Sequence, residues 1–190
     1  MLSLSRLTAA LVFVAASAGT AEAQRVARSG IHLGAAVNGS QVSYDEGDTD
    51  RGPGLSIYGG YNFTSSLGVV LAVTAASVTS DGDDSYMLRH IDLLGRYSFG
   101  GATLAPYVEA GYSNLNADGD TEDGDLVYKG SGITGGVGMN YFMKPKLGLD
   151  VSLRYTKGKF SSFELEGEEF SRGDLDVSTM RINIGFAYYL

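Results

Sequence analysis

The chain has 190 residues, a formal net charge of −8 and no cysteine. A fold held together by disulfides is therefore excluded, and the acidic balance does not suit a protein that binds nucleic acid. With 27 glycines, 12 tyrosines and three prolines, the composition favours strands and tight turns over helices.

The N-terminal segment has the parts of a secretory signal peptide. Arg6 precedes an apolar run over residues 7–18, and the small-residue box Ala21-Glu22-Ala23 ends the segment. The alternative is an uncleaved membrane anchor, but the run is shorter than the roughly 18 to 20 residues that a spanning helix needs. We therefore predict a signal peptide over residues 1–23 and a single exported domain over residues 24–190.

Eight segments of this domain alternate between apolar residues and polar or small ones, which is typical of strands with two different faces. In the last segment, for example, Ile182 and Ile184 enclose Asn183. The eight apolar sides lie, in chain order, within residues 31–37, 55–63, 67–75, 91–99, 108–112, 133–141, 147–155 and 182–190.

The connections between these segments alternate in length. Those after the second, fourth and sixth segments are tight, at residues 64–66, 100–103 and 143–146. The other four are longer and acidic, at residues 45–51, 81–84, 118–125 and 164–176. An even number of antiparallel strands with short turns at one end and long loops at the other is typical of an outer-membrane barrel. We therefore predict an all-β fold, an eight-stranded antiparallel up-and-down transmembrane β-barrel in the bacterial outer membrane.

A soluble barrel would bury the apolar face instead, and alternation alone does not separate the two cases. A barrel of about eight strands has an interior just wide enough for ordinary side chains, whereas the apolar face here has several large residues in nearly every strand. Within the predicted strands, all carboxylates lie on the polar face. A charge facing the middle of a bilayer costs a few kcal/mol, so this distribution predicts that the apolar face meets lipid.

Aromatic residues on the apolar face gather near the strand ends, where the two interfacial girdles of a membrane barrel lie. Arg89 and Lys129 share this face, but both are near the loop ends of their strands and can reach the interface. The predicted girdle residues are Tyr61, Phe63, Tyr97, Phe99, Tyr141, Phe186 and Tyr188 near the turns, and Tyr112 and Tyr155 near the long loops.

The polar face would line the lumen, where its formal charges cancel. Because isolated charges in a lumen are costly, we expect them to form ion pairs. A tight turn centred near Gly101 makes Arg96 a diagonal neighbour of Glu109, and these two residues are predicted to pair. The six candidates for lumenal ion pairs are Asp92, Glu109 and Asp150, and Arg96, Arg154 and Arg181.

Three stretches, at residues 91–99, 105–111 and 185–190, are similar to sequences found in eight-stranded outer-membrane barrels. Residues 24–190 as a whole resemble the OmpA-type and OmpX-type barrel family, a porin-like family of outer-membrane proteins. The resemblance implies contact with outer-membrane lipids and lipopolysaccharide, and recognition by the barrel-assembly machinery during biogenesis. In that family the last strand commonly ends in Phe or Trp, whereas here it ends in Leu190. We expect a monomer without a cofactor.

Three functions are compatible with such a barrel. The favoured one is a non-enzymatic surface protein that contributes to envelope structure or adhesion, with its acidic loops contacting extracellular proteins. The second is a narrow passive channel, which requires the lumenal ion pairs to open. The third is a lipid-modifying enzyme, for which only His32 and His90 are available. His90 shares the lumenal face with Asp92, away from lipid, and no serine has a spacing that would make it an activated nucleophile.

The acidic stretch at residues 118–125 raises the question of calcium, because carboxylates at alternate positions offer hard oxygen ligands. Its spacing departs from that of an EF-hand, with Gly124 one position late. A solvated loop whose charges repel one another explains the stretch better. We therefore predict no metal site.

Overall fold

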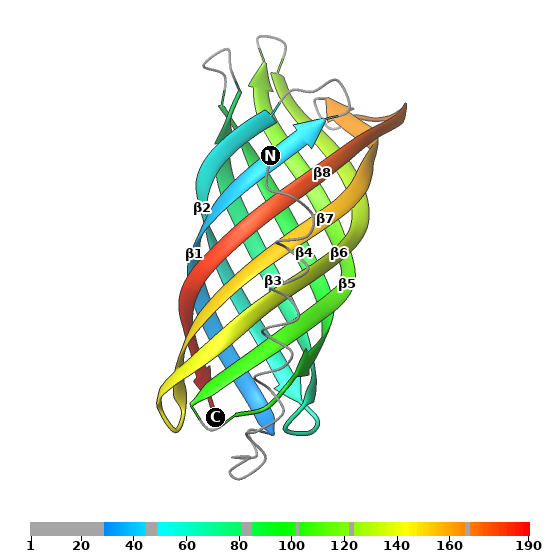
Figure 1. The fold of residues 1–190 in the computed structure, drawn as a ribbon. Coiled ribbons are helices and arrows are strands. Elements are labelled where there is room, and N and C mark those ends of the chain that lie inside the picture. The colour runs from blue at the N-terminus through cyan, green and yellow to red at the C-terminus, as the bar shows by residue number, and fades with distance from the viewer. Residues whose placement is uncertain (1–28, 45–48, 81–84, 102, 122–123, 166–167) are drawn as a thin grey trace, which may run out of the picture.

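Eight antiparallel strands close into one barrel (Figure 1). Each strand pairs with its neighbours in sequence, and β8 pairs with β1 to close the sheet. The predicted eight-stranded barrel is confirmed. The strands are β1 (Gly30–Tyr44), β2 (Thr49–Asn62), β3 (Leu67–Thr79), β4 (Ser85–Ser98), β5 (Leu104–Thr121), β6 (Gly124–Lys144), β7 (Leu147–Leu165) and β8 (Glu168–Tyr189).

The computed structural model describes residues 29–44, 49–80, 85–101, 103–121, 124–165 and 168–190. The predicted signal peptide lies outside the described residues. Among those that are described, no helix is long and apolar enough to cross a membrane.

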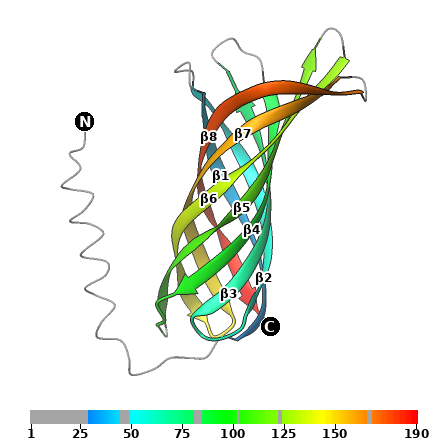
Figure 2. The same cartoon turned by 90° about the vertical axis from the view of Figure 1, so that its right-hand side faces the viewer.

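The two ends of the barrel differ. The tight turns and the C-terminal end of β8 lie together at one end, which we call the turn end, and the other four hairpins form the hairpin end (Figures 1 and 2). At the turn after β2, the hydroxyl of Thr64 accepts the amide of Leu67 at 2.9 Å. The turn after β4 uses Gly100 and Gly101, with φ of 77° and 153°, a region that residues with a Cβ rarely adopt.

The strands run further into the acidic connections than predicted. β2 begins at Thr49, β5 and β6 extend to Thr121 and from Gly124, and β7 and β8 extend to Leu165 and from Glu168. The prediction of long loops is therefore wrong for most of residues 118–125 and 164–176, which form extended hairpins (Figure 2). Hydrophobic alternation disappears where both faces of a hairpin meet water, although the backbone ladder continues.

The apolar face is the outside of the barrel. Leu55 on β2 and Ile133 on β6 are 66% and 73% exposed, whereas Val70, Thr74 and Asp92 on inward positions are at most 1% exposed. In all eight segments the residues predicted to face inward do so. Side chains alternate along a strand, so the register of the closed barrel decides which alternate residues enter the lumen.

All nine predicted girdle residues lie on the outer wall and are at least 43% exposed. Two pairs stack edge to face, with ring centroids 5.4 Å apart for Tyr61 and Phe63 and 5.2 Å for Tyr97 and Phe99. These geometries stabilise aromatic pairs beyond the area they bury. Their role as an interfacial girdle stays a prediction.

Two acids that the sequence assigned to loops lie in strands on the outer wall near the hairpin end. Asp118 on β5 pairs with Arg89 at 2.7 Å, and Asp176 on β8 approaches Lys159 at 3.9 Å. The outer wall therefore does have carboxylates, but each has a cation beside it and lies beyond the apolar part of its strand.

The exposure pattern predicts which outward positions tolerate charge. Leu93→Arg, in the middle of β4, should lower the free energy of unfolding by about 2–4 kcal/mol in phospholipid vesicles, because the guanidinium would face hydrocarbon. Ser77→Arg, outward but near the hairpin end of β3, should cost only about 0–1 kcal/mol. Guanidinium titrations of both variants measure this difference, and equal effects at the two positions would contradict a lipid-facing outer wall.

Candidate functional site

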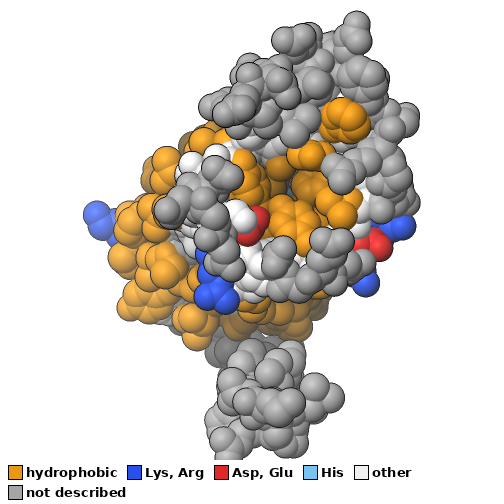
Figure 3. All heavy atoms as spheres, turned by 90° about the horizontal axis from the view of Figure 1, so that it is seen from above, with side chains coloured by type: hydrophobic (Ala, Val, Ile, Leu, Met, Phe, Trp, Pro, Cys, Tyr) orange, Lys and Arg blue, Asp and Glu red, His pale blue; other side chains and the backbone are white. Residues whose placement is uncertain are grey.

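Two apolar clusters enclose a polar belt inside the lumen. Along the inward face of β8, Val177 belongs to the cluster nearer the hairpin end, Thr179, Arg181 and Asn183 are polar, and Ala187 belongs to the cluster nearer the turn end. Hydrophobic side chains also line the mouth at the hairpin end (Figure 3). The hairpin-end cluster is Val42, Ala76, Val78, Leu88, Leu115, Ala117, Phe160 and Val177. The turn-end cluster is Tyr58, Val70, Ala72, Leu94, Ala105, Phe142, Ala187 and Tyr189.

The sequence-based view of the inward face as mostly small and polar missed these clusters. Leu88, Leu115 and Phe160 share the parity of the lumenal charges on their strands. If the alternation of inward and outward residues is continued past the predicted strand ends, these three side chains are assigned to the lumen.

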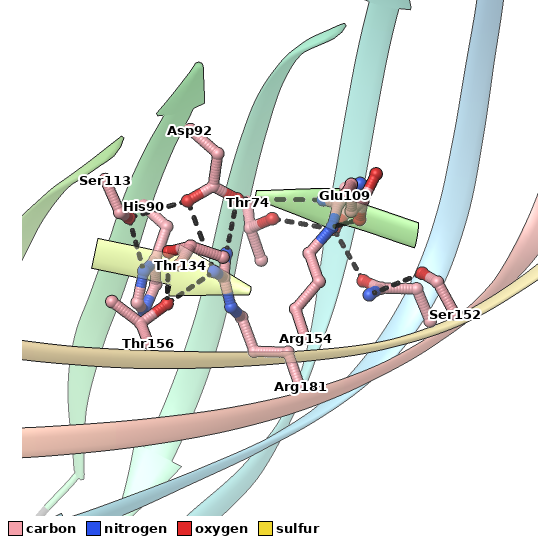
Figure 4. A network of polar contacts seen from close by, with 12 residues as sticks. Thr74, His90, Asp92, Glu109, Ser113, Thr134, Ser152, Arg154, Thr156 and Arg181 are labelled. Carbon is pink, nitrogen blue, oxygen red and sulfur yellow. Dashed lines mark hydrogen bonds and ion pairs between the residues drawn. The ribbon is translucent and has the colours of Figure 1, made fainter. Parts of the chain in front are cut away.

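The six predicted lumenal charges form one connected chain in the polar belt, most of which is drawn in Figure 4. Glu109 on β5 lies between two arginines: its Oε2 accepts Arg96 Nη2 at 2.8 Å and its Oε1 accepts Arg154 Nε at 2.6 Å. Arg154 then approaches Asp92 Oδ2 at 3.6 Å, and Arg181 donates to the same oxygen at 2.8 Å. At the other end, Arg96 lies 4.0 Å from Asp150.

This charge chain alternates in sign along the order Asp150, Arg96, Glu109, Arg154, Asp92 and Arg181. Asp92 is on β4 and Arg181 is on β8, and these strands lie four apart in either direction around the closed barrel. Their ion pair therefore crosses the full bore of the lumen.

Neutral groups complete the coordination of the charge chain. The hydroxyl of Tyr107 donates to Asp150 at 3.1 Å, and the guanidinium of Arg96 lies 3.9 Å from the centre of the Tyr107 ring. Ser113 donates to Asp92 at 2.6 Å. Hydrogen bonds of this kind are needed to offset the desolvation of buried ions.

The Arg96 and Glu109 side chains meet as the sequence predicted, but with a different register. The two residues lie directly opposite each other on β4 and β5, whereas a diagonal arrangement was expected. Because Ser98 pairs with Tyr107, the register of the hairpin is centred one to two positions after Gly101.

Asp50 is a further buried acid in the lumen that the sequence analysis did not identify. Its Oδ2 accepts the hydroxyl of Tyr86 at 2.9 Å, and that hydroxyl lies 2.9 Å from the hydroxyl of Tyr44. Asp50 had been assigned to a loop, but β2 begins before it. Asp50 is separated from Ser56 and Tyr58 by an even number of residues, so it lies on the same inward face of β2. This alternation could have identified it from the sequence.

The structure brings together a serine, a histidine and an aspartate. Ser113 lies 3.2 Å from His90 Nδ1 and 2.6 Å from Asp92, so the expectation that no serine would be suitably placed is corrected. The order is wrong for catalysis, because a catalytic histidine lies between the serine and the acid. Here the serine lies between the other two and donates to the acid, and all three are buried among the arginines.

Metal ligands do not gather in the described part of the chain. Within it, no group of three or more His, Cys, Asp or Glu side chains could hold a metal ion. Residues 122–123 of the acidic stretch lie outside the described residues.

Comparison with known proteins identifies the family. The family model described as outer membrane protein beta-barrel domain matches residues 7–189. The chain belongs to this family. No curated protein sequence matches it significantly.

Several solved structures of outer-membrane proteins share the fold. Neisserial surface protein A has a TM-score of 0.70 at 20% identity, covering 86% of this chain and 99% of that one. Ail of Yersinia pestis has a TM-score of 0.56 at 14% identity, and the match covers 84% of this chain and 99% of Ail. OprG of Pseudomonas aeruginosa has a TM-score of 0.55 at 15% identity, and the match covers 85% of this chain and 97% of OprG. At these identities the similarity concerns the fold alone.

The charge chain predicts strong coupling between its members. Glu109→Gln leaves two buried arginines without their shared carboxylate and should cost about 3–5 kcal/mol of unfolding free energy, as should Arg96→Met. The double variant should cost less than the sum of the two, because the residues interact. Denaturant titrations of the double-mutant cycle in vesicles measure this coupling.

Arg89→Gln is the matched control, because this arginine is paired on the exposed outer wall and should contribute at most about 1 kcal/mol. If the losses of unfolding free energy from the Glu109 and Arg96 substitutions add up in the double variant, the members of the charge chain are not energetically coupled.

Proposed function

We propose that this chain is a non-enzymatic surface protein of the outer membrane that acts through its outer wall and acidic hairpins, with its lumen closed. The observation that supports this proposal is the Arg181–Asp92 ion pair, with N–O distances of 2.8 and 3.2 Å, which crosses the bore. Apolar clusters lie on both sides of this pair along the bore, one towards the hairpin end and one towards the turn end.

The short turns of such barrels face the periplasm and the longer connections face the cell exterior. The hairpin end, with its acidic residues, would then lie outside the cell. In the sequence, residues 118–125 and 164–176 hold eleven acids and one arginine, and this negative charge favours basic patches on partner proteins. One protein of similar fold, Ail, bears the name attachment invasion locus protein, and adhesion is our proposal for this chain.

A passive channel would require the charge chain to separate inside the lumen. Each ion freed there pays a desolvation cost of several kcal/mol, so the closed arrangement is favoured. A lipid-modifying enzyme would need its reacting groups on the outer wall, whereas His90 and Ser113 are buried in the lumen.

A closed lumen predicts no steady conductance in planar lipid bilayers. Phe142→Ala should also be silent, because it opens the turn-end cluster but leaves the Arg181–Asp92 pair across the bore. A stable open current from the unmodified protein would contradict the proposal and favour the channel.

A deletion strain tests the surface role. Loss of the protein should reduce attachment to host or environmental surfaces or weaken resistance to detergent. Complementation with a chain in which the acids of residues 118–125 are replaced by their amides should restore detergent resistance but not attachment. Full attachment with the neutralised hairpin would exclude these acids as the contact.

A further inference from the structure

A carboxylate and two phenols meet inside the mouth of the barrel at the hairpin end. Asp50 comes from β2, Tyr86 from β4 and Tyr44 from β1. Because β3 separates β2 from β4, Tyr86 reaches across the inside of the sheet to Asp50. Its hydroxyl lies 2.9 Å from Asp50 Oδ2 and 2.9 Å from the hydroxyl of Tyr44. Three strands therefore contribute to one polar group in the lumen.

Apolar side chains surround this group. Asp50 is 4% exposed and pairs with Val42 on β1, and Tyr86 pairs with Val78 on β3. Both valines belong to the hairpin-end cluster, and Tyr44 and Tyr86 pack against this cluster while they stay partly exposed. The mouth is hollowed and hydrophobic side chains line it (Figure 3). A small molecule that enters this mouth would meet apolar surface and a carboxylate.

The negative charge of Asp50 has no counter-ion in the described part of the chain. No Lys, Arg or His side chain described by the structure forms an ion pair with it. The six charges of the polar belt cancel one another, so they leave no spare positive charge for Asp50. A buried carboxylate with a single neutral hydrogen-bond partner carries a large desolvation cost. A cation bound beside Asp50 would offset part of that cost.

The directions of the hydrogen bonds select the kind of cation. Tyr86 donates its only hydroxyl hydrogen to Asp50, so Tyr44 must be the donor in the bond between the two phenols. The oxygen of Tyr44 and Oδ1 of Asp50 are then left as acceptors. A primary ammonium has three N–H donors and no acceptor, whereas a quaternary ammonium has no donor. The faces of the tyrosine rings also favour a cation.

We propose that the mouth at the hairpin end binds a primary ammonium group on a short apolar stem. The ammonium donates to Asp50 and to the oxygen of Tyr44, and the stem packs on the hairpin-end cluster. The site is blind, because the Arg181–Asp92 ion pair crosses the bore further down. Asp92 follows Tyr86 by six residues on β4, which is about 20 Å of strand. The site therefore binds the amine without passing it through the barrel.

The test is an NMR titration of the isotope-labelled protein in nanodiscs of zwitterionic phospholipid, with hexylammonium at neutral pH as the probe. Saturable shifts of the amide signals of Tyr44, Asp50 and Tyr86 are expected. The uncharged analogue 1-hexanol has the same stem and should bind at least about tenfold more weakly, because it lacks the charge-assisted hydrogen bond to Asp50.

Variants separate the carboxylate from the apolar surface. Asp50→Asn should weaken hexylammonium binding by about tenfold, while its amide oxygen still accepts the Tyr86 hydroxyl and preserves the fold. Tyr44→Phe should weaken binding by about fivefold, because one neutral acceptor is lost. Tyr112→Phe removes a hydroxyl from the outer wall, where Tyr112 is 50% exposed, and is the matched control with unchanged affinity. Heat-modifiable migration shows that each variant is folded.

A free alkylamine and the lysine side chain of a partner protein could both supply the ammonium. An acetylated tripeptide with a central lysine distinguishes them. Binding of the peptide that Asp50→Asn weakens supports the site with a partner's lysine as the source. Hexylammonium binding without peptide binding supports it with a free amine as the source.

Three outcomes would overturn the proposal. They are undiminished hexylammonium binding by Asp50→Asn, equal affinity for 1-hexanol, and the absence of saturable shifts at the three residues. None of them bears on the closed lumen or on attachment, because bilayer conductance and the deletion strain test those separately.

Discussion

The pairing of β8 with β1 is the interaction on which the rest of the barrel depends. Within a bilayer no water is available to a free strand edge, so every backbone amide and carbonyl must find a partner in the sheet. β1 and β8 supply that partner from His32 opposite Tyr189 to Tyr44 opposite Val177. Because a slip of one residue would exchange the two faces, closure also decides which side chains enter the lumen.

Because closure of the barrel buries the inward side chains, the charges among them must be paired. Asp92 is fully buried, accepts hydrogen bonds from Arg181 and Ser113, and has the guanidinium of Arg154 3.6 Å away, so that its charge is compensated. A buried ion pair is weak evidence for net stability, since apolar side chains of equal volume often serve as well. We infer that its stronger effect is on register, because a slip would move Asp92 to the outer wall and leave Arg181 alone in the lumen.

The fold was predictable from the sequence because its signals are local. Alternation along 182–190 and the tight turns at residues 64–66 and 100–103 each involve few residues, and the Arg96 and Glu109 pair joins neighbouring strands of one hairpin. Contacts that depend on closure were not predictable in this way. The Asp92 and Arg181 side chains are 89 residues apart in sequence, and their contact requires the curvature of the whole barrel. The upper limits of the strands were missed because the acids there hide the alternation, and Asp50 was missed with them.

The distribution of charge between lumen and outer surface bears on how the barrel sits in its membrane. The six charges of the polar belt cancel one another, and Asp50 is a further acid nearer the hairpin end. On the outer wall, Arg51 on β2 and Lys157 on β7 are exposed cations, whereas Asp118 and Asp176 belong to the strands of the hairpin end. An anionic lipid surface attracts the first pair and repels the acidic hairpins. The same field that would hold the wall at a fixed depth would therefore keep the hairpins extended away from the membrane, where a protein partner can reach them.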